Sequence, residues 1–88
     1  ADNDPRQAFM RKRSLTIHGH RTSISLEEPF WMALNDIAKA RQQSVASLVQ
    51  VIDKKRVGGL SSAIRVFILA ELRHQLAAST TTKTNQIF

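Results

Sequence analysis

The chain has 88 residues, a formal net charge of +6 and no cysteine. That length allows one domain, and a domain this short buries only about 60% of the surface that its unfolded chain exposes. Disulfides and thiolate zinc sites are excluded, and no apolar run approaches the ~20 residues that a membrane span requires. We therefore expect a cytoplasmic domain that completes its core by association, with a basic surface that favours nucleic acid.

The N-terminal segment 1–11 is polar, contains Pro5 and has no hydrophobic period. We interpret it as a flexible arm ahead of a domain at 12–76. The basic run Arg11-Lys12-Arg13 lies where this arm meets the first strand-like segment, and cationic side chains in such a position can contact phosphates. A charge run is also typical of an ordinary solvated surface.

Two short segments, 14–18 and 21–26, alternate between apolar and polar residues. Alternation with β-branched residues predicts half-buried strands. Gly19 separates the two segments, which either form a hairpin around 18–20 or leave one of them to pair with another chain. The polar face of the second segment contains Arg21, Ser23 and Ser25.

A helix is predicted over 29–42, where apolar residues recur at helical spacing. Pro29 suits the first turn of a helix, and Glu27 and Glu28 are favoured at the positive end of the helix dipole. Trp31 is off the main apolar stripe, and we expect it at the edge of the core or in an interface.

A second helix is predicted over 45–56, with Ser44 as its N-cap. It ends before the glycine pair 58–59, a usual C-terminal signal. A third helix is expected over 63–76 with Ser61 or Ser62 as its cap. Its apolar residues cover more than one face, which predicts burial on two sides. The remaining residues, 77–88, are interpreted as a polar tail.

A single strand ahead of two helices has unpaired edges and half a core. The simplest solution is two chains that pair the segment 21–26 antiparallel across a two-fold axis, so that its polar face is presented twice. A two-stranded ribbon fits the major groove, where arginine can bond guanine and serine can bond either kind of base pair. The same face is also what an ordinary solvated strand presents. If 14–18 supplies the ribbon, the outward residues are Ser14, Thr16 and His18.

The order of strand, proline-started helix, short turn, Ser44-Val45 and second helix resembles the ribbon-helix-helix repressors of the Arc and MetJ type. The segments KRSLTIHGHRTSISLE, FWMALNDIA and LSSAIRVFIL are similar to a bacterial subgroup of that family. The resemblance implies a mainly α fold with a short β-ribbon and an intertwined homodimer, here with a third, C-terminal helix. The turn 41–43 departs from the pattern, because family members often have glycine there.

The ribbon geometry and the resemblance together assign base contacts to Arg21, Ser23 and Ser25. A capped helix N-terminus is an anion site, so phosphate contacts are assigned to residues at the start of the second helix and to the basic run: Ser44, Val45, Ser47, Arg11, Lys12 and Arg13. The dimer core is expected to contain apolar residues of the strand and the first two helices: Ile24, Leu26, Phe30, Leu34, Ile37, Leu48, Val49 and Ile52.

The expected function is a sequence-specific DNA-binding homodimer that regulates transcription as a repressor in the cytoplasm, on the nucleoid. Assembly beyond the dimer is left open. The alternative is a protein-interaction module that presents the third helix to a partner, as an antitoxin does to a toxin. No catalytic motif is present, and we expect no cofactor and no membrane partner. His18 and His20 form an H-x-H pair, but without cysteine or a nearby carboxylate they are weak evidence for a metal site.

Overall fold

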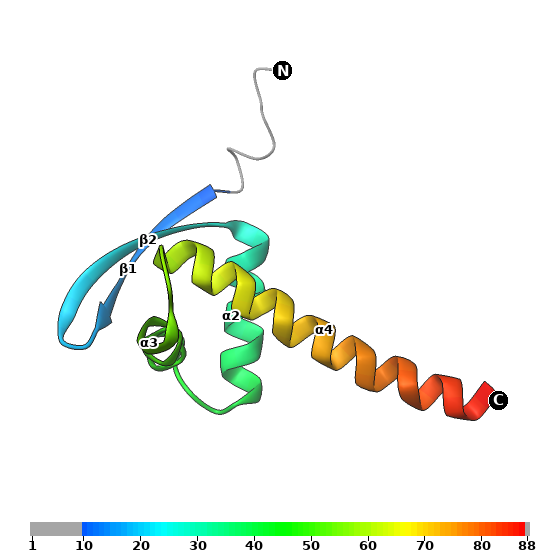
Figure 1. The fold of residues 1–88 in the computed structure, drawn as a ribbon. Helices are drawn as coiled ribbons and strands as arrows, with labels where there is room; N and C mark the ends of the chain where they lie inside the picture. The colour runs from blue at the N-terminus through cyan, green and yellow to red at the C-terminus, as the bar shows by residue number, and fades with distance from the viewer. Residues whose placement is uncertain (1–9, 88) are drawn as a thin grey trace, which may run out of the picture.

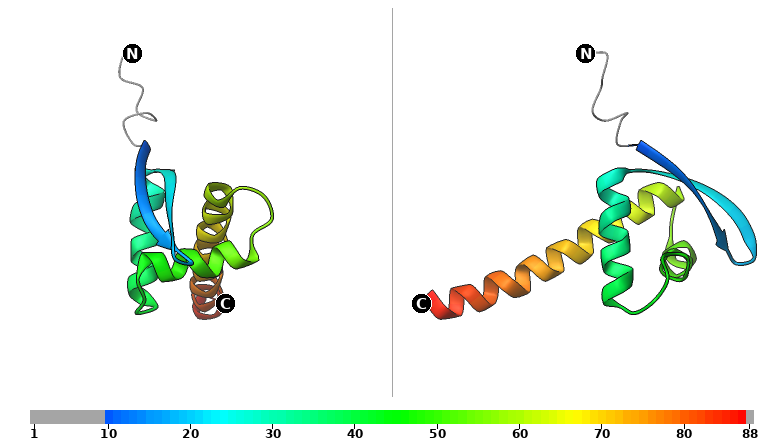
Figure 2. Two further views of the ribbon diagram at one scale, coloured as in Figure 1. Left: turned by 90° about the vertical axis from the view of Figure 1, so that its left-hand side faces the viewer. Right: turned by 180° about the vertical axis from the view of Figure 1, so that it is seen from behind.

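The computed structural model describes the backbone of residues 10–87 and the side chains as far as residue 78. Two strands, β1 (Met10–Ile17) and β2 (His20–Glu27), precede three helices, α2 (Glu28–Ala40), α3 (Val45–Lys55) and α4 (Leu60–Ile87). The strands lie on one side of the helices, and α4 extends away from the others at its C-terminal end (Figures 1 and 2). The expected mainly helical fold with a short ribbon and an added helix is confirmed.

The ribbon forms within one chain. β1 and β2 pair antiparallel from Met10 opposite Glu27 to Ile17 opposite His20. The two residues between them, His18 and Gly19, have φ values of 51° and 80°, as a type I′ hairpin turn requires. Of the two pairings that the sequence left open, the described chain forms the hairpin, which leaves the other edge of β2 without a strand partner in the single chain, so pairing of 21–26 with a second chain stays a prediction. The local pairing is favoured because a two-residue connection costs little loop-closure entropy.

The turn after α2 contains no glycine, yet it has the backbone conformation in which glycine is usual. The backbone N–H of Gln43 donates to the carbonyl of Ala38, and that of Gln42 donates to Lys39, both at 3.0 Å. This is the Schellman arrangement, which needs a left-handed residue just after the helix. Gln42 occupies that position with φ 56°, where glycine is the usual residue.

The other element boundaries agree in part with the sequence expectations. Ser44 caps α3, because its hydroxyl accepts a hydrogen bond of 3.0 Å from the N–H of Ser47. The expected cap of the third helix is wrong, since α4 begins at Leu60 and the N–H of Ala63 donates to Gly59. The expected tail is helical as far as residue 87, because no glycine or proline follows Gly59 to end the helix.

β1 begins at Met10, so the basic run belongs to a strand and not to an arm. Residues 1–9, which make up most of the expected arm, lie outside the described part of the chain, as does residue 88. The strand is longer than predicted because its first half pairs with the second half of β2.

One cluster of buried apolar residues forms within the single chain. Seven of the eight residues expected in the dimer core are buried in it, and Phe30 is partly buried. Trp31, expected at the edge of the core or in an interface, is buried as well, with its indole N–H donating to the carbonyl of Arg11 at 2.9 Å. Within the single chain, the described part of α4 is buried on one side, through Ile64 and Ile68, so burial of a second side by an assembly stays a prediction. The buried apolar residues are Ile17, Ile24, Leu26, Trp31, Leu34, Ile37, Ala38, Leu48, Val49, Ile52, Ile64 and Ile68.

Candidate nucleic-acid interface

The outer face of the hairpin follows from the register of its strands. Residues directly opposite one another in an antiparallel pair lie on the same face, and neighbours along a strand alternate between faces. Ile24 and Leu26 are buried against the helices, so the residues that alternate with them along β2, and the residues opposite those on β1, lie on the other face. Before the junction with α2, where Met10 is opposite Glu27, these are the pairs Lys12 with Ser25, Ser14 with Ser23, and Thr16 with Arg21.

The hairpin therefore brings the two alternative sets of base-reading residues together. Ser14 and Thr16 share one face with Arg21 and Ser23, although the two segments were expected to be alternatives. His18 is the exception, because it occupies the turn. The backbone N–H of His18 donates to Gln50 Oε1 at 3.0 Å, and the ring Nε2 of His18 lies 3.5 Å from Asp53 Oδ2. These contacts attach the tip of the ribbon to α3.

The basic run is divided by the same alternation. Lys12 lies on the outer face, whereas Arg11 and Arg13 lie on the helix side of β1. Arg11 Nε is 2.8 Å from Glu28 Oε1, an ion pair outside hydrogen-bond geometry, and the Arg13 guanidinium lies 5.4 Å from the centre of the Trp31 ring. The three residues thus do not form one phosphate-contacting cluster. In the sequence, continuing the two-residue period of the strand back to residue 10 places Lys12 on one face and Arg11 and Arg13 on the other.

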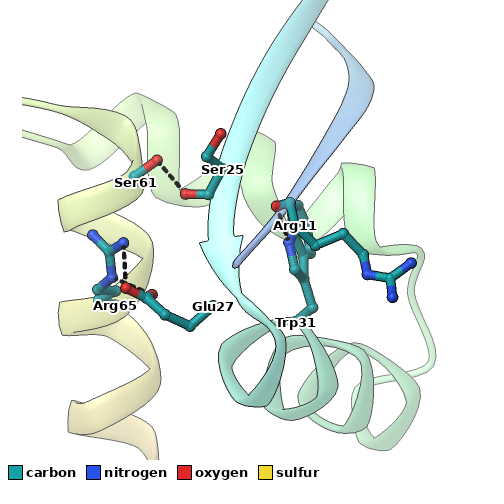
Figure 3. A network of polar contacts seen from close by, with 6 residues as sticks. All are labelled: Arg11, Ser25, Glu27, Trp31, Ser61 and Arg65. Carbon is teal, nitrogen blue, oxygen red and sulfur yellow. Dashed lines mark hydrogen bonds and ion pairs between the residues drawn. The ribbon is translucent and has the colours of Figure 1, made fainter. Parts of the chain in front are cut away.

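The junction of β2 with α2 is held by the start of α4 (Figure 3). Arg65 donates two hydrogen bonds to the Glu27 carboxylate, at 2.9 and 3.2 Å, and Ser61 Oγ donates to the Ser25 carbonyl at 3.1 Å. The bonds from Arg65 lower the pKa of the Glu27 carboxyl below its usual value. Glu27 is the N-cap residue of α2 but its side chain makes no cap bond, so it orients the ribbon relative to α4. Sequence reasoning did not identify Arg65.

The start of α3 offers backbone donors. Ser44 accepts the N–H of Ser47, and the Ser47 hydroxyl donates to Gln43 Oε1 at 3.4 Å. Both hydroxyls are therefore engaged in local bonds. The N–H groups of Val45 and Ala46 remain at the helix start, where a helix supplies no acceptor and the dipole favours an anion.

Two cationic side chains of the outer face have no ion pair among residues 10–78. Residues 10–78 include five acidic side chains, of which four form ion pairs with arginine: Glu27 with Arg65, Glu28 with Arg11, Asp53 with Arg56, and Glu71 with Arg41. In this part of the chain Lys12 and Arg21 make no ion pair and no side-chain hydrogen bond, so both are available to an anionic partner.

Two other kinds of site are absent from the described residues. No three of their His, Asp or Glu side chains gather as a metal site would require. None of the helices in this part of the chain combines the length and the apolar character needed to cross a membrane.

The family model for the ribbon-helix-helix domain matches residues 10–72, from the start of β1 into α4. The chain therefore belongs to the ribbon-helix-helix family, as the motifs indicated. Domains of this family are in general DNA-binding regulators and are typically not enzymes.

Among solved structures, the fold is similar to that of an uncharacterized protein from Bordetella pertussis Tohama I. The TM-score is 0.69 and the sequence identity 28%, over 86% of this chain and 66% of that chain. The present chain thus spans slightly less than two thirds of the length of that protein. A comparison with curated proteins gave no match.

Proposed function

We propose that the protein is a homodimeric, sequence-specific DNA-binding regulator of transcription, a repressor that inserts the β1–β2 ribbon into the major groove. The observation that carries this proposal is the outer face of the hairpin. It presents Lys12, Thr16 and Arg21 on one surface, opposite the buried side of the strands. A two-stranded ribbon is one of the elements that the major groove admits.

The chemistry of the face suits base reading. The Arg21 guanidinium can bond O6 and N7 of guanine bidentately, and the hydroxyls of Thr16 and Ser23 can donate to or accept from either kind of base pair. Lys12 and the start of α3 would contact phosphates, which fix the position of the ribbon without reading sequence. Because each chain carries its own ribbon, a homodimer would present two ribbons and recognise a two-fold-symmetric site.

Selection of bound duplexes from a random DNA pool, at near-physiological salt, tests the proposal. The wild-type chain should enrich a two-fold-symmetric motif. The triple variant Thr16→Val, Arg21→Ala, Ser23→Ala should lose the motif, whereas Lys39→Ala, an exposed α2 residue away from the ribbon, should retain it. A motif that survives in the triple variant contradicts base reading by this face.

A groove between α3 and α4 supports a second candidate function, the binding of another protein. The groove has a volume of about 480 Å³ and is lined by the apolar residues Val51, Ile52 and Phe67 among others, and by the cations Arg41 and Lys55. Apolar contact flanked by cations is complementary to an acidic amphipathic helix.

Selection from a displayed library of helical peptides tests this second function. Acidic amphipathic sequences should be enriched by the wild-type chain and not by Val66→Lys, which places a charge in the groove. Enrichment that is equal for both chains would contradict binding in the groove.

A further inference from the structure

The groove between α3 and α4 lies between the two helices that hold opposite ends of the ribbon. At the tip, Gln50 of α3 accepts the backbone N–H of His18 at 3.0 Å, and Asp53 of α3 lies 3.5 Å from the ring Nε2 of His18. At the end next to α2, Arg65 of α4 donates two hydrogen bonds to Glu27 (Figure 3). None of these five residues lines the groove. The position of α3 relative to α4 therefore sets the position of one end of the ribbon relative to the other.

The connection between the two helices is open and contains two glycines. It covers residues 56–59, from the end of α3 at Lys55 to the start of α4 at Leu60. Gly58 has a φ of 94°, and apart from the chain neighbours no heavy atom lies within 4 Å of the Cβ position at Gly58 or Gly59. Glycine is the residue with the greatest backbone freedom. The connection thus places little restraint on the angle between α3 and α4.

The lining of the groove indicates what would fill it. Val51, Val57 and Val66 line it and are 42%, 98% and 63% exposed, so an occupant would bury apolar surface that the chain leaves in water. The charged lining residues are all cations, and Lys55 among them forms no ion pair within residues 10–78. This charge complements an acidic occupant with one apolar face, which is the amphipathic helix of the second candidate function.

We infer that an acidic amphipathic helix of a partner protein, bound in this groove, raises the affinity of the ribbon for DNA. With its apolar face against α3 and α4, the helix fixes the angle between them and holds both ends of the ribbon in one arrangement. A ribbon that is ordered beforehand pays less of the entropy cost of binding. The inference rests on the DNA-binding function and on the second candidate function, and it couples the two. All the contacts that carry it lie within one chain, so it is compatible with pairing of β2 with a second chain.

Fluorescence anisotropy of the full chain with the selected duplex tests the coupling, with the peptide enriched from the helical library as the probe. A saturating concentration of this peptide should lower the Kd for the duplex about fivefold, at the lower end of the usual range because the anchoring contacts are partly exposed. Saturating duplex should lower the Kd for the peptide by the same factor, since coupling is reciprocal. A scrambled peptide of equal composition, which keeps the charge and loses the apolar face, should have no effect.

Two variants test whether the coupling passes through the ends of the ribbon. Gln50→Ala removes the contact at the tip, and Arg65→Gln weakens the one next to α2. Neither residue lines the groove, so each variant should bind the peptide as the wild type does when DNA is absent. The effect of the peptide on the Kd for the duplex should nevertheless fall towards onefold. Lys39→Ala, away from both sites, should keep the full effect, and circular dichroism checks that each variant is folded.

The same titrations separate failure of the inference from failure of the functions on which it rests. A chain that binds the peptide and the duplex, with a Kd for the duplex that the peptide leaves unchanged or raises, overturns the inference alone. A full peptide effect in both Gln50→Ala and Arg65→Gln overturns the route through the ribbon ends. A chain that binds no duplex contradicts the DNA-binding function, and one that binds no acidic helix contradicts the second candidate function; either result overturns the inference as well.

Discussion

Thr16 lies directly opposite Arg21 across the β1–β2 hairpin, on the face turned away from the buried Ile24. The pair joins two segments that the sequence presents as alternatives for contacting DNA. The Thr16 hydroxyl and the Arg21 guanidinium lie on adjacent strands, so one face of the ribbon offers hydrogen-bond donors from both strands to a DNA groove.

Replacing Arg21 by alanine should cost about 1–3 kcal/mol of binding free energy at a specific site and relax the base preference there, because a bidentate contact is lost. Fluorescence anisotropy with the selected duplex and with single-base variants measures both effects. Lys39→Ala is the matched control and should change neither. Unchanged affinity and preference in Arg21→Ala would remove it from the reading face.

Lys12 and Arg13 are adjacent in sequence but should behave differently. Lys12→Ala should weaken binding to all duplexes and reduce the slope of log affinity against log salt by about 0.9, the contribution of one phosphate contact. Arg13→Ala should leave that slope unchanged and instead lower the free energy of unfolding by about 0.5–1 kcal/mol, because its guanidinium packs over Trp31. Salt titrations and urea unfolding of both variants provide the test. Equal salt slopes for the two variants would contradict the division of the basic run.

Gln42→Gly should stabilise the fold. Gln42 adopts φ 56°, which costs an L-residue roughly 1–2 kcal/mol, and glycine relieves this at a cost in unfolded-state entropy of about 0.5–1 kcal/mol. We expect a net gain of about 0.5–1 kcal/mol in urea unfolding. Gln43→Gly, one residue later, gains no such relief and should be neutral or destabilising. A loss of stability in Gln42→Gly would contradict the helix-end geometry.

The Glu27–Arg65 contact should make stability depend on pH at the acidic end. The pKa of Glu27 is lowered in the folded chain from an ordinary value of 4.5. Its stabilising contribution is therefore present above about pH 4.5 and is lost as the pH falls through the lower folded value. In the wild type, the free energy of unfolding should fall as the pH is lowered. Glu27→Gln and Arg65→Gln should each make this fall smaller. The double variant should add nothing to either, and additive effects would indicate that the two residues act independently.

Local patterns predicted much of this fold. Alternation predicted both strands and the polar face that contains Arg21 and Ser23, and Ser44 was recognisable as a cap because a cap depends on residues within one turn. No local pattern could indicate that Arg65 bonds Glu27, since 38 residues separate the partners. The left-handed conformation of Gln42 is not predictable from its residue type, because the hydrogen bonds that end α2 impose it. The apolar alternation that predicts the first strand begins at residue 14, so it does not show that Arg11 and Arg13 belong to β1 and lie on its helix side.

Entry of the hairpin into DNA is measured most directly by an NMR titration of the full chain with the selected duplex. Amide chemical-shift changes should concentrate at 12–16 and 21–25 and at the start of α3, with 69–76 unaffected at saturation. Changes confined to α3 and α4, with the hairpin amides unmoved, would contradict DNA binding by the ribbon.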